Sequence, residues 1–197
     1  VAYGAGSSPA LIQALYISKG PMLIAALVEF GIVWYLSSRI YKLSLASATL
    51  WFILFSAING LTLGWIFAVY KIAIIAKTFF VTAGTFGAMA LIGSTTKKDL
   101  TKFGGILFMA LIGLIIASLV NLFLHSSTMD YIVSIVGVLI FTGLTAWDAQ
   151  AIKRNLLMAP DAGESAQKIA LLGSLSLYLD FINLFLYLLR FFGNNKN

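Results

Sequence analysis

The chain has 197 residues, of which 60% are apolar and 10% are charged, and it contains no cysteine. Soluble domains have roughly 25% charged residues, so this chain has too few to cover a water-facing surface, and disulfide frameworks and thiolate metal sites are excluded. The formal net charge of +6 would indicate nucleic acid as a partner of a soluble protein, but these cations lie in short gaps between apolar runs, where they act as topology signals and lipid-headgroup anchors. We therefore expect the lipid bilayer, and no nucleic acid, as a partner.

Six apolar runs are long enough, or nearly long enough, to cross a bilayer, which takes about 20 residues of helix. They cover residues 21–38, 45–70, 78–93, 106–124, 131–152 and 169–192. Their apolar residues are continuous and do not alternate with polar ones, which favours helices over barrel strands. We predict an all-α fold, a polytopic membrane helix bundle that forms a single transmembrane domain over residues 1–197. The longest gap, residues 153–168, contains Pro160 and Gly163 and is predicted to be a turn.

The start of the chain resembles the tail of a helix. Val1 stands where a complete chain has Met, and the apolar stretch Val1 to Ala5 continues directly into Gly6-Ser7-Ser8-Pro9. We therefore expect that an N-terminal span is missing from this sequence.

The distribution of Lys and Arg predicts the orientation. The gaps after the first, third and fifth runs hold 8 of these residues, and the other side holds 5. The positive-inside rule then places these three gaps in the cytoplasm and the C-terminus outside.

Three carboxylates lie inside the apolar runs: Glu29, Asp148 and Asp180. Each carboxylate at membrane depth costs at least about 2.5–3.5 kcal/mol on insertion scales, so each is a candidate functional group. The runs that carry Asp148 and Asp180 are joined by a short gap and are predicted to be antiparallel neighbours. Because Asp180 lies further from that gap, contact between the two carboxyls needs tilted or staggered helices. If the carboxyls meet, they cannot easily both be charged, and they titrate as a unit that senses pH.

Structural roles compete with these functional interpretations. Either aspartate could cap a helix or form one hydrogen bond to a neighbouring helix, and Glu29 could be satisfied by Arg39 or by a hydroxyl group of the run 45–70. Arg39 could equally be a cytoplasmic anchor. Within the runs, Asn59, Asn121 and Asn183 are expected to form hydrogen bonds between helices. Close helix packing is expected at small residues, namely Gly60, Gly64, Ala83, Gly84, Gly87 and Ala88.

No catalytic residues are predicted, and we do not expect an enzyme. A membrane serine protease needs a nucleophile turn and a deeply placed histidine, which neither Ser174 nor His125 offers. Two intramembrane aspartates are also found in membrane aspartyl proteases, but Asp180 follows Ser-Leu-Tyr-Leu where those proteases have Gly-x-Gly.

Several longer strings carry a resemblance to a known family. They are TTKKDL (95–100), FMALIG (108–113), GLTAWD (143–148), SLYLDFINLF (176–185) and LLRFFG (188–193). Together they resemble the bacterial members of the Bax inhibitor family, over essentially the whole chain and most specifically in the C-terminal strings.

The resemblance implies a function as well as a fold. Members have seven spanning helices with the last surrounded by the other six, so this chain is similar to a member that lacks the first helix. The family is associated with a pH-sensitive calcium leak controlled by an aspartate pair, which matches Asp148 and Asp180. A basic residue thought to bind the closed pair is matched by Arg39, while Glu29 and Asn183 are candidates for the ion pathway. The expected location is the inner membrane.

Calcium is expected as a permeant ion, together with protons, and no cofactor is expected. Calcium takes 6–8 oxygen ligands, so Asp148 and Asp180 with water would form only a weak metal site. Such a weak site suits permeation, which needs binding that is easily reversed. The resemblance also leaves a second function open, because some bacterial relatives look like modulators of a membrane-bound ATP-dependent protease and form no pore.

Overall fold

The computed structural model describes residues 1–13 and 19–194, which are helical with no strand among them. They divide into two compact units, each described here by itself. The first unit comprises Val1–Ile75 and Ala159–Leu172, and the second comprises Ala76–Met158 and the part of the chain from Gly173 onward. The all-α class predicted from the sequence is confirmed, whereas the prediction of a single transmembrane domain stays a prediction.

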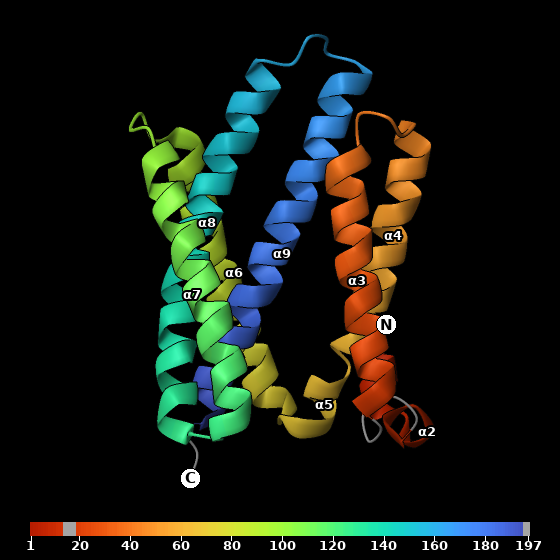
Figure 1. The fold of residues 1–197 in the computed structure, drawn as a ribbon, viewed down its shortest axis with the longest axis vertical. Coiled ribbons are helices and arrows are strands. Elements are labelled where there is room, and N and C mark those ends of the chain that lie inside the picture. The colour runs from red at the N-terminus through yellow and green to blue at the C-terminus, as the bar shows by residue number, and fades with distance from the viewer. Residues whose placement is uncertain (14–18, 195–197) are drawn as a thin grey trace. The chain divides into compact units, whose positions relative to one another are not determined.

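The first unit is built on a helical hairpin. Its helices are α1 (Ala2–Ser7), α2 (Pro9–Leu11), α3 (Lys19–Arg39), α4 (Leu45–Thr62) and α5 (Trp65–Val69). α3 and α4 lie side by side and antiparallel (Figure 1). The hydroxyl of Ser44 accepts a hydrogen bond from the Ser47 amide at 3.2 Å and so caps the start of α4. Across the hairpin, the rings of Tyr35 and Trp51 pack with their centroids 5.3 Å apart.

The apolar run predicted over residues 45–70 is interrupted, since α4 ends at Thr62 and α5 begins at Trp65. At this break α1 approaches α5 closely. A methyl group added to Gly6 would overlap the carbonyl oxygen of Gly64, and the ring of Tyr3 meets that of Phe67 edge-on at 5.5 Å. Only glycine at position 6 leaves room for this contact.

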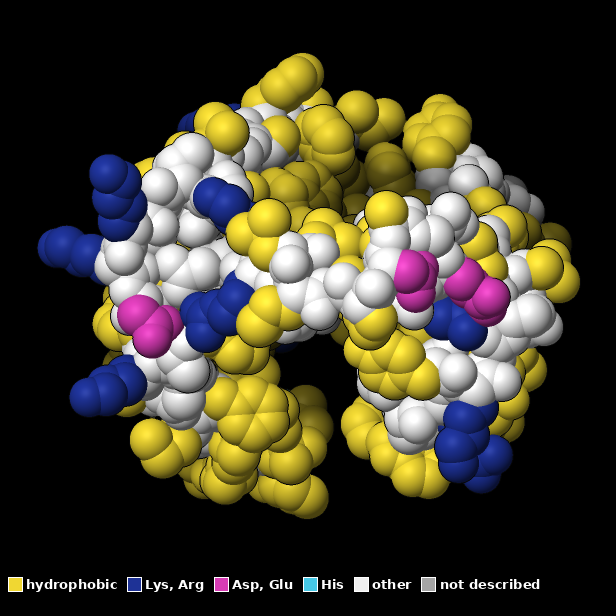
Figure 2. Space-filling view, turned by 90° about the horizontal axis from the view of Figure 1, so that it is seen from above, with side chains coloured by type: hydrophobic (Ala, Val, Ile, Leu, Met, Phe, Trp, Pro, Cys, Tyr) yellow, Lys and Arg dark blue, Asp and Glu magenta, His cyan; other side chains and the backbone are white. Residues whose placement is uncertain are grey.

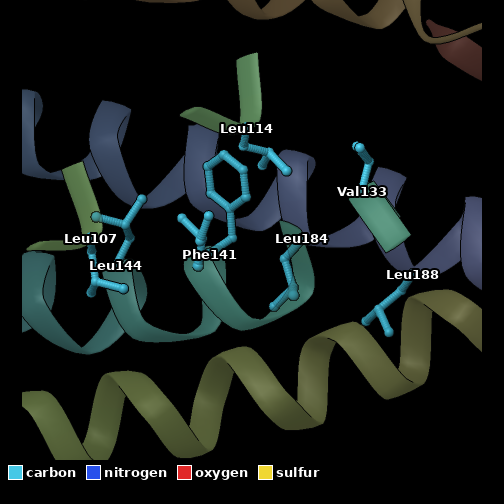
Figure 3. Close-up of a cluster of buried hydrophobic side chains, with 8 residues drawn as sticks. Leu107, Leu114, Val133, Phe141, Leu144, Leu184 and Leu188 are labelled. Carbon is cyan, nitrogen blue, oxygen red and sulfur yellow. The ribbon is translucent and has the colours of Figure 1, made fainter. Parts of the chain in front are cut away.

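The second unit contains most of α6 (Ile72–Thr95), α7 (Thr101–Leu124), α8 (Ser127–Leu157) and the larger part of α9 (Glu164–Asn194). A cluster of buried aliphatic and aromatic side chains joins three of these helices (Figure 3). It is formed by Leu107 and Leu114 of α7, Val133, Ile140, Phe141 and Leu144 of α8, and Leu184 and Leu188 of α9. This cluster holds α9 against α7 and α8 within the unit.

The predicted turn over residues 153–168 is wrong in extent, because the non-helical part is only residues 158–163. Helix α8 continues through Arg154, and α9 already begins at Glu164. The apolar run marks only the part of a helix inside the hydrocarbon, while backbone hydrogen bonding continues into the headgroup layer, where polar side chains are favourable. In the loop, hydrogen bonds from Ser165 and from the Gly163 amide hold the pKa of Asp161 below its usual value.

Five helical segments in the described part of the chain are long and apolar enough to cross a membrane. They are Leu45–Val69, Ile72–Thr95, Thr101–Leu124, Ser127–Leu157 and Glu164–Gly193. Helix α3 covers the first predicted run but is not among these five. The count of six spans therefore stays a prediction, as does a central position of the C-terminal helix. Large exposed side chains such as Phe80 and Phe123 lie on these segments, as expected for faces that contact lipid.

Close helix packing occurs at a glycine that the sequence pattern did not single out. A Cβ atom added to Gly84 or Gly87 would have no described atom outside its own helix within 4 Å, so the prediction of close packing there is wrong. A Cβ atom added to Gly93 would instead overlap the carbonyl group of Ala146 on α8. Gly93 is therefore where the backbones of α6 and α8 come together.

We predict that Gly93→Ala destabilises the protein by about 1–3 kcal/mol, because the new methyl group meets rigid backbone and the two helices must separate. Gly87→Ala on the same helix is the matched control and is expected to leave stability unchanged or slightly raised. Thermal unfolding in detergent measures both variants. Equal unfolding temperatures for the two would contradict the packing described for Gly93.

Candidate functional site

The side chains of Asp148 on α8 and Asp180 on α9 meet within the second unit, close enough for their carboxyl groups to interact directly. Asp180 is 5% exposed and Asp148 is half-buried. The structure thus brings together the two residues that the sequence predicted as a pair, although they lie at unequal distances from the loop that joins their helices. The stagger that contact requires is present.

The chemistry of the pair depends on one proton. A hydrogen bond between two carboxyl groups needs a proton on one of them, since two carboxylates only accept. Among the described residues, Oδ2 of Asp180 is a buried side-chain oxygen without a hydrogen-bond donor. Leaving a buried polar atom unpaired costs about 1–3 kcal/mol, so this arrangement is a poor way to stabilise a fold.

The pair lies in the seam between α8 and α9, between two close contacts. On one side, a Cβ atom added to Gly173 would come within 2.6 Å of Ile152. On the other side, one added to Gly137 would come within 2.6 Å of the Tyr187 ring, which also stacks on Phe141 at 5.7 Å. Asp180 lies seven residues after Gly173 and seven before Tyr187, the spacing that keeps residues on one seam of two packed helices.

Helix α6 packs on α9 directly beside the pair. The ring of Phe181, the residue after Asp180, lies edge-on to Phe79 at 5.8 Å and to Phe86 at 5.4 Å. Thr82 on α6 is fully buried, and its hydroxyl donates to the carbonyl oxygen of Thr78 at 2.7 Å. Aromatic rings of α6 therefore pack on α9 at the residue that follows Asp180.

Glu29 lies in the first unit and is held by α4. Its Oε2 accepts a hydrogen bond from the Asn59 amide at 3.0 Å, and its Oε1 accepts one from the Thr62 hydroxyl at 2.7 Å. Both oxygens of this carboxyl group are thus engaged at the end of α4. This arrangement agrees with the structural interpretation, in which a hydroxyl of the run 45–70 satisfies Glu29, and its role in an ion pathway stays a prediction.

Asn183 bonds within its own helix, and Arg39 belongs to the other unit. The amide of Asn183 donates to the carbonyl oxygen of Leu179 on its own helix at 2.8 Å, so the predicted bond between helices is wrong for this residue. Arg39 is the last residue of α3, in the first unit, and its side chain is exposed. The role of Asn183 in an ion pathway and the latching of the pair by Arg39 stay predictions.

The pair has too few ligands for a tight metal site. No cluster of three or more Asp, Glu, His or Cys side chains that could hold a metal ion occurs in the described part of the chain. Two aspartates supply at most four carboxylate oxygens, whereas calcium takes 6–8. An ion that reached the pair would keep several of its water ligands.

Known proteins similar to this chain place it in a family. The sequence model described as "Inhibitor of apoptosis-promoting Bax1" matches residues 1–197. The chain belongs to the Bax inhibitor family. Over its whole length it is 48% identical to the inner membrane protein YbhL of Escherichia coli (strain K12), of which it covers 84%. The predicted family is therefore confirmed, and the chain is a multi-pass protein of the inner membrane.

Two further relatives show how widely similar chains occur. Over its whole length the chain is 45% identical to an uncharacterized protein of Borreliella burgdorferi, of which it covers 84%. It is also 43% identical, over 87% of its length, to an uncharacterized membrane protein of Streptococcus pyogenes serotype M1, of which it covers 73%.

This member of the Bax inhibitor family also has a polar cluster that the sequence did not reveal. Asp130 lies just outside the apolar run predicted over residues 131–152, but the structure places it in the first turn of α8. Its Oδ1 accepts a hydrogen bond from the Asn121 amide at 2.8 Å and lies 3.9 Å from Nη1 of Arg190. A helix start at Ser126, whose hydroxyl accepts from the Met129 amide, was the signal that could have placed Asp130 inside α8.

The contact between the two aspartates can be tested by cross-linking, because the chain has no cysteine of its own. We predict that Asp148→Cys combined with Asp180→Cys is joined by a short bifunctional thiol reagent, since the two side chains lie next to each other in the seam. A protease site inserted into the loop 158–163 lets a denaturing gel show whether the two halves stay joined.

The matched control combines Asp180→Cys with Leu139→Cys. Leu139 is also on α8 but is 66% exposed, so this pair is expected to separate after cleavage. Equal joining of the two pairs, or none in either, would contradict the seam described above.

Proposed function

We propose that this protein is a pH-sensitive calcium leak channel whose opening is linked to the protonation of Asp148 and Asp180. The observation that carries the proposal is the meeting of these two carboxyl groups, one from each of the last two helices, in a seam bounded by close glycine contacts. Membership of the Bax inhibitor family agrees with it. A buried carboxyl pair of this kind needs a reason to be kept inside a membrane protein, and linkage to function supplies one.

The pair couples protons to the distance between α8 and α9. With one shared proton, the hydrogen bond between the carboxyls draws the two helices together at this level. Without that proton, two carboxylates face each other in a medium of low dielectric constant and repel each other strongly. The same two groups thus favour a closed seam in one protonation state and a wider seam in the other, as a pH-controlled gate requires.

The same two carboxyl groups support the proposal that the permeant ion is a divalent cation. Two oxygen-bearing side chains attract calcium but leave most of its ligand positions to water. A site of this kind admits the ion and releases it again, which conduction requires. In the closed state the Arg39 guanidinium is proposed to bind the pair. The guanidinium would then compete with a cation for the carboxyl oxygens of Asp148 and Asp180.

Calcium flux into liposomes that contain the purified protein tests the proposal. We expect the flux of the parent protein to differ between about pH 6 and pH 8. We expect Asp148→Asn and Asp180→Asn each to bring the ratio of these two fluxes close to 1, because neither variant can exchange the shared proton. An entrapped calcium-sensitive dye measures the flux.

The matched control is Glu164→Gln, which removes another acid of α9. Glu164 pairs with Lys168 at 2.8 Å and its side chain is 61% exposed, so the flux and its pH dependence are expected to stay as in the parent. An unchanged pH response in both aspartate variants would rule out the pair as the sensor. A parent protein without any flux would leave modulation of an ATP-dependent membrane protease as the alternative function.

A further inference from the structure

A pocket with an excess of positive charge lies where the loop between α6 and α7 meets the end of α8. It has a volume of about 330 Å³, and its charged lining residues are Lys97, Lys98, Asp99, Lys153 and Arg154. Figure 2 views this end of the molecule and shows Lys and Arg side chains gathered on it. By the positive-inside rule, this is the side predicted to be cytoplasmic.

The single acid of the pocket is already engaged. Asp99 accepts hydrogen bonds from the hydroxyl and the amide of Thr101 at 2.6 and 2.9 Å, and Arg154 pairs with it at 3.2 Å. These bonds, with those from Thr101 as the main cause, hold the pKa of Asp99 below its usual value, so it is charged at neutral pH. The Arg154 charge is thereby matched by the charge of Asp99.

Three lysines remain without an acidic partner in this pocket. Among the described residues, the Arg154–Asp99 pair is the ion pair of the pocket. The ammonium group of Lys153 donates to the carbonyl oxygen of Ser94 at 2.7 Å, which positions it without neutralising its charge. Lys97 and Lys98 lie in the same loop and are exposed. The pocket therefore attracts an anion.

An apolar groove continues from this pocket. It has a volume of about 470 Å³ and shares the lining residues Ser94, Lys153 and Leu157 with the charged pocket. The rest of its lining is aliphatic: Ala90, Leu91, Ala149, Ile152, Leu156 and Leu177. Leu91 and Leu157 are 67% and 78% exposed, as expected for side chains that contact lipid.

We propose that the charged pocket and the apolar groove together bind an anionic phospholipid of the cytoplasmic leaflet. The lysines take the phosphate of the headgroup, and an acyl chain lies along the groove between α6 and α8. Basic pockets at this membrane level attract anionic headgroups. The charge distribution selects an anionic lipid over a zwitterionic one, because no unpaired acid is left to bind an ammonium group. The aliphatic continuation selects a lipid over a free phosphate ion, which would gain nothing from it.

Native mass spectrometry of the protein in detergent, mixed with equal amounts of phosphatidylglycerol and phosphatidylethanolamine, tests the site. We expect retained phosphatidylglycerol to dominate. We expect Lys153→Gln to weaken its binding about fivefold, the effect of one lysine near a membrane surface. The matched control is Lys102→Gln, which removes a lysine just beyond the loop that does not line the pocket.

A second variant and a competitor separate a lipid from a simple anion. Leu91→Gln changes only the groove, and it is expected to weaken the binding of phosphatidylglycerol. Inorganic phosphate at millimolar concentration is expected not to displace the lipid. Equal retention of both lipids, equal effects of Lys153→Gln and Lys102→Gln, or displacement by phosphate would each overturn the proposal. Size-exclusion profiles show whether the variants fold, and Lys153 and Leu91 are both exposed, so no core contact is lost.

Discussion

The contact between the carboxyl groups of Asp148 and Asp180, the second of which is buried, is the constraint on which the packing of α8 against α9 depends. Helices α8 and α9 can approach at this level only if their carboxyls share a proton or move apart, because two carboxylates in a dry seam repel each other. The glycines on either side remove the alternative of holding the helices apart with bulky side chains. Gly137 lets the Tyr187 ring lie against α8, and Gly173 lets Ile152 lie against α9. The packing therefore presses together the two groups that electrostatics would separate.

A comparison of Glu29 with Asp180 shows why one intramembrane acid supports a functional interpretation more strongly than another. Both oxygens of Glu29 accept hydrogen bonds, from Asn59 and Thr62, so its insertion cost is offset within the helical hairpin. Asp180 has one oxygen without a partner among the described residues and another acid as its neighbour. The carboxyl group of Asp180 therefore contributes less to stability than its burial costs. The hydrogen bonds of Glu29, in contrast, are enough to explain it as a structural residue.

The sequence was enough to predict the fold class and the two residues that form the pair, but not the packing of the helices around them. Continuous apolar runs were enough to predict helices, and the insertion cost of a carboxylate was enough to single out Asp148 and Asp180. The ends of α8 and α9 were misplaced because hydropathy marks the hydrocarbon and not the length of a helix. The close contacts were misplaced only in part, because Gly64 of the small-residue pattern does meet Gly6. Gly84 and Gly87 matched the small-residue pattern, but whether a glycine faces another helix depends on rotation about the helix axis, which the pattern does not fix.

The spacing of seven residues from Gly173 to Asp180 and on to Tyr187 was the signal in the sequence that could have identified the seam. Polar contacts tie both helices of the seam to neighbouring segments. Helix α8 is tied to the loop after α6 by Gln150, whose Oε1 accepts from the Leu100 amide at 2.8 Å and whose Nε2 donates to the Lys98 carbonyl oxygen at 2.7 Å. Helix α9 is tied to α8 in turn, since Nη1 of Arg190 lies 3.9 Å from Oδ1 of Asp130. A change in the protonation of the pair therefore acts on two helices that are both anchored outside the seam, so its effect is concentrated on the separation of α8 and α9 at the level of the pair.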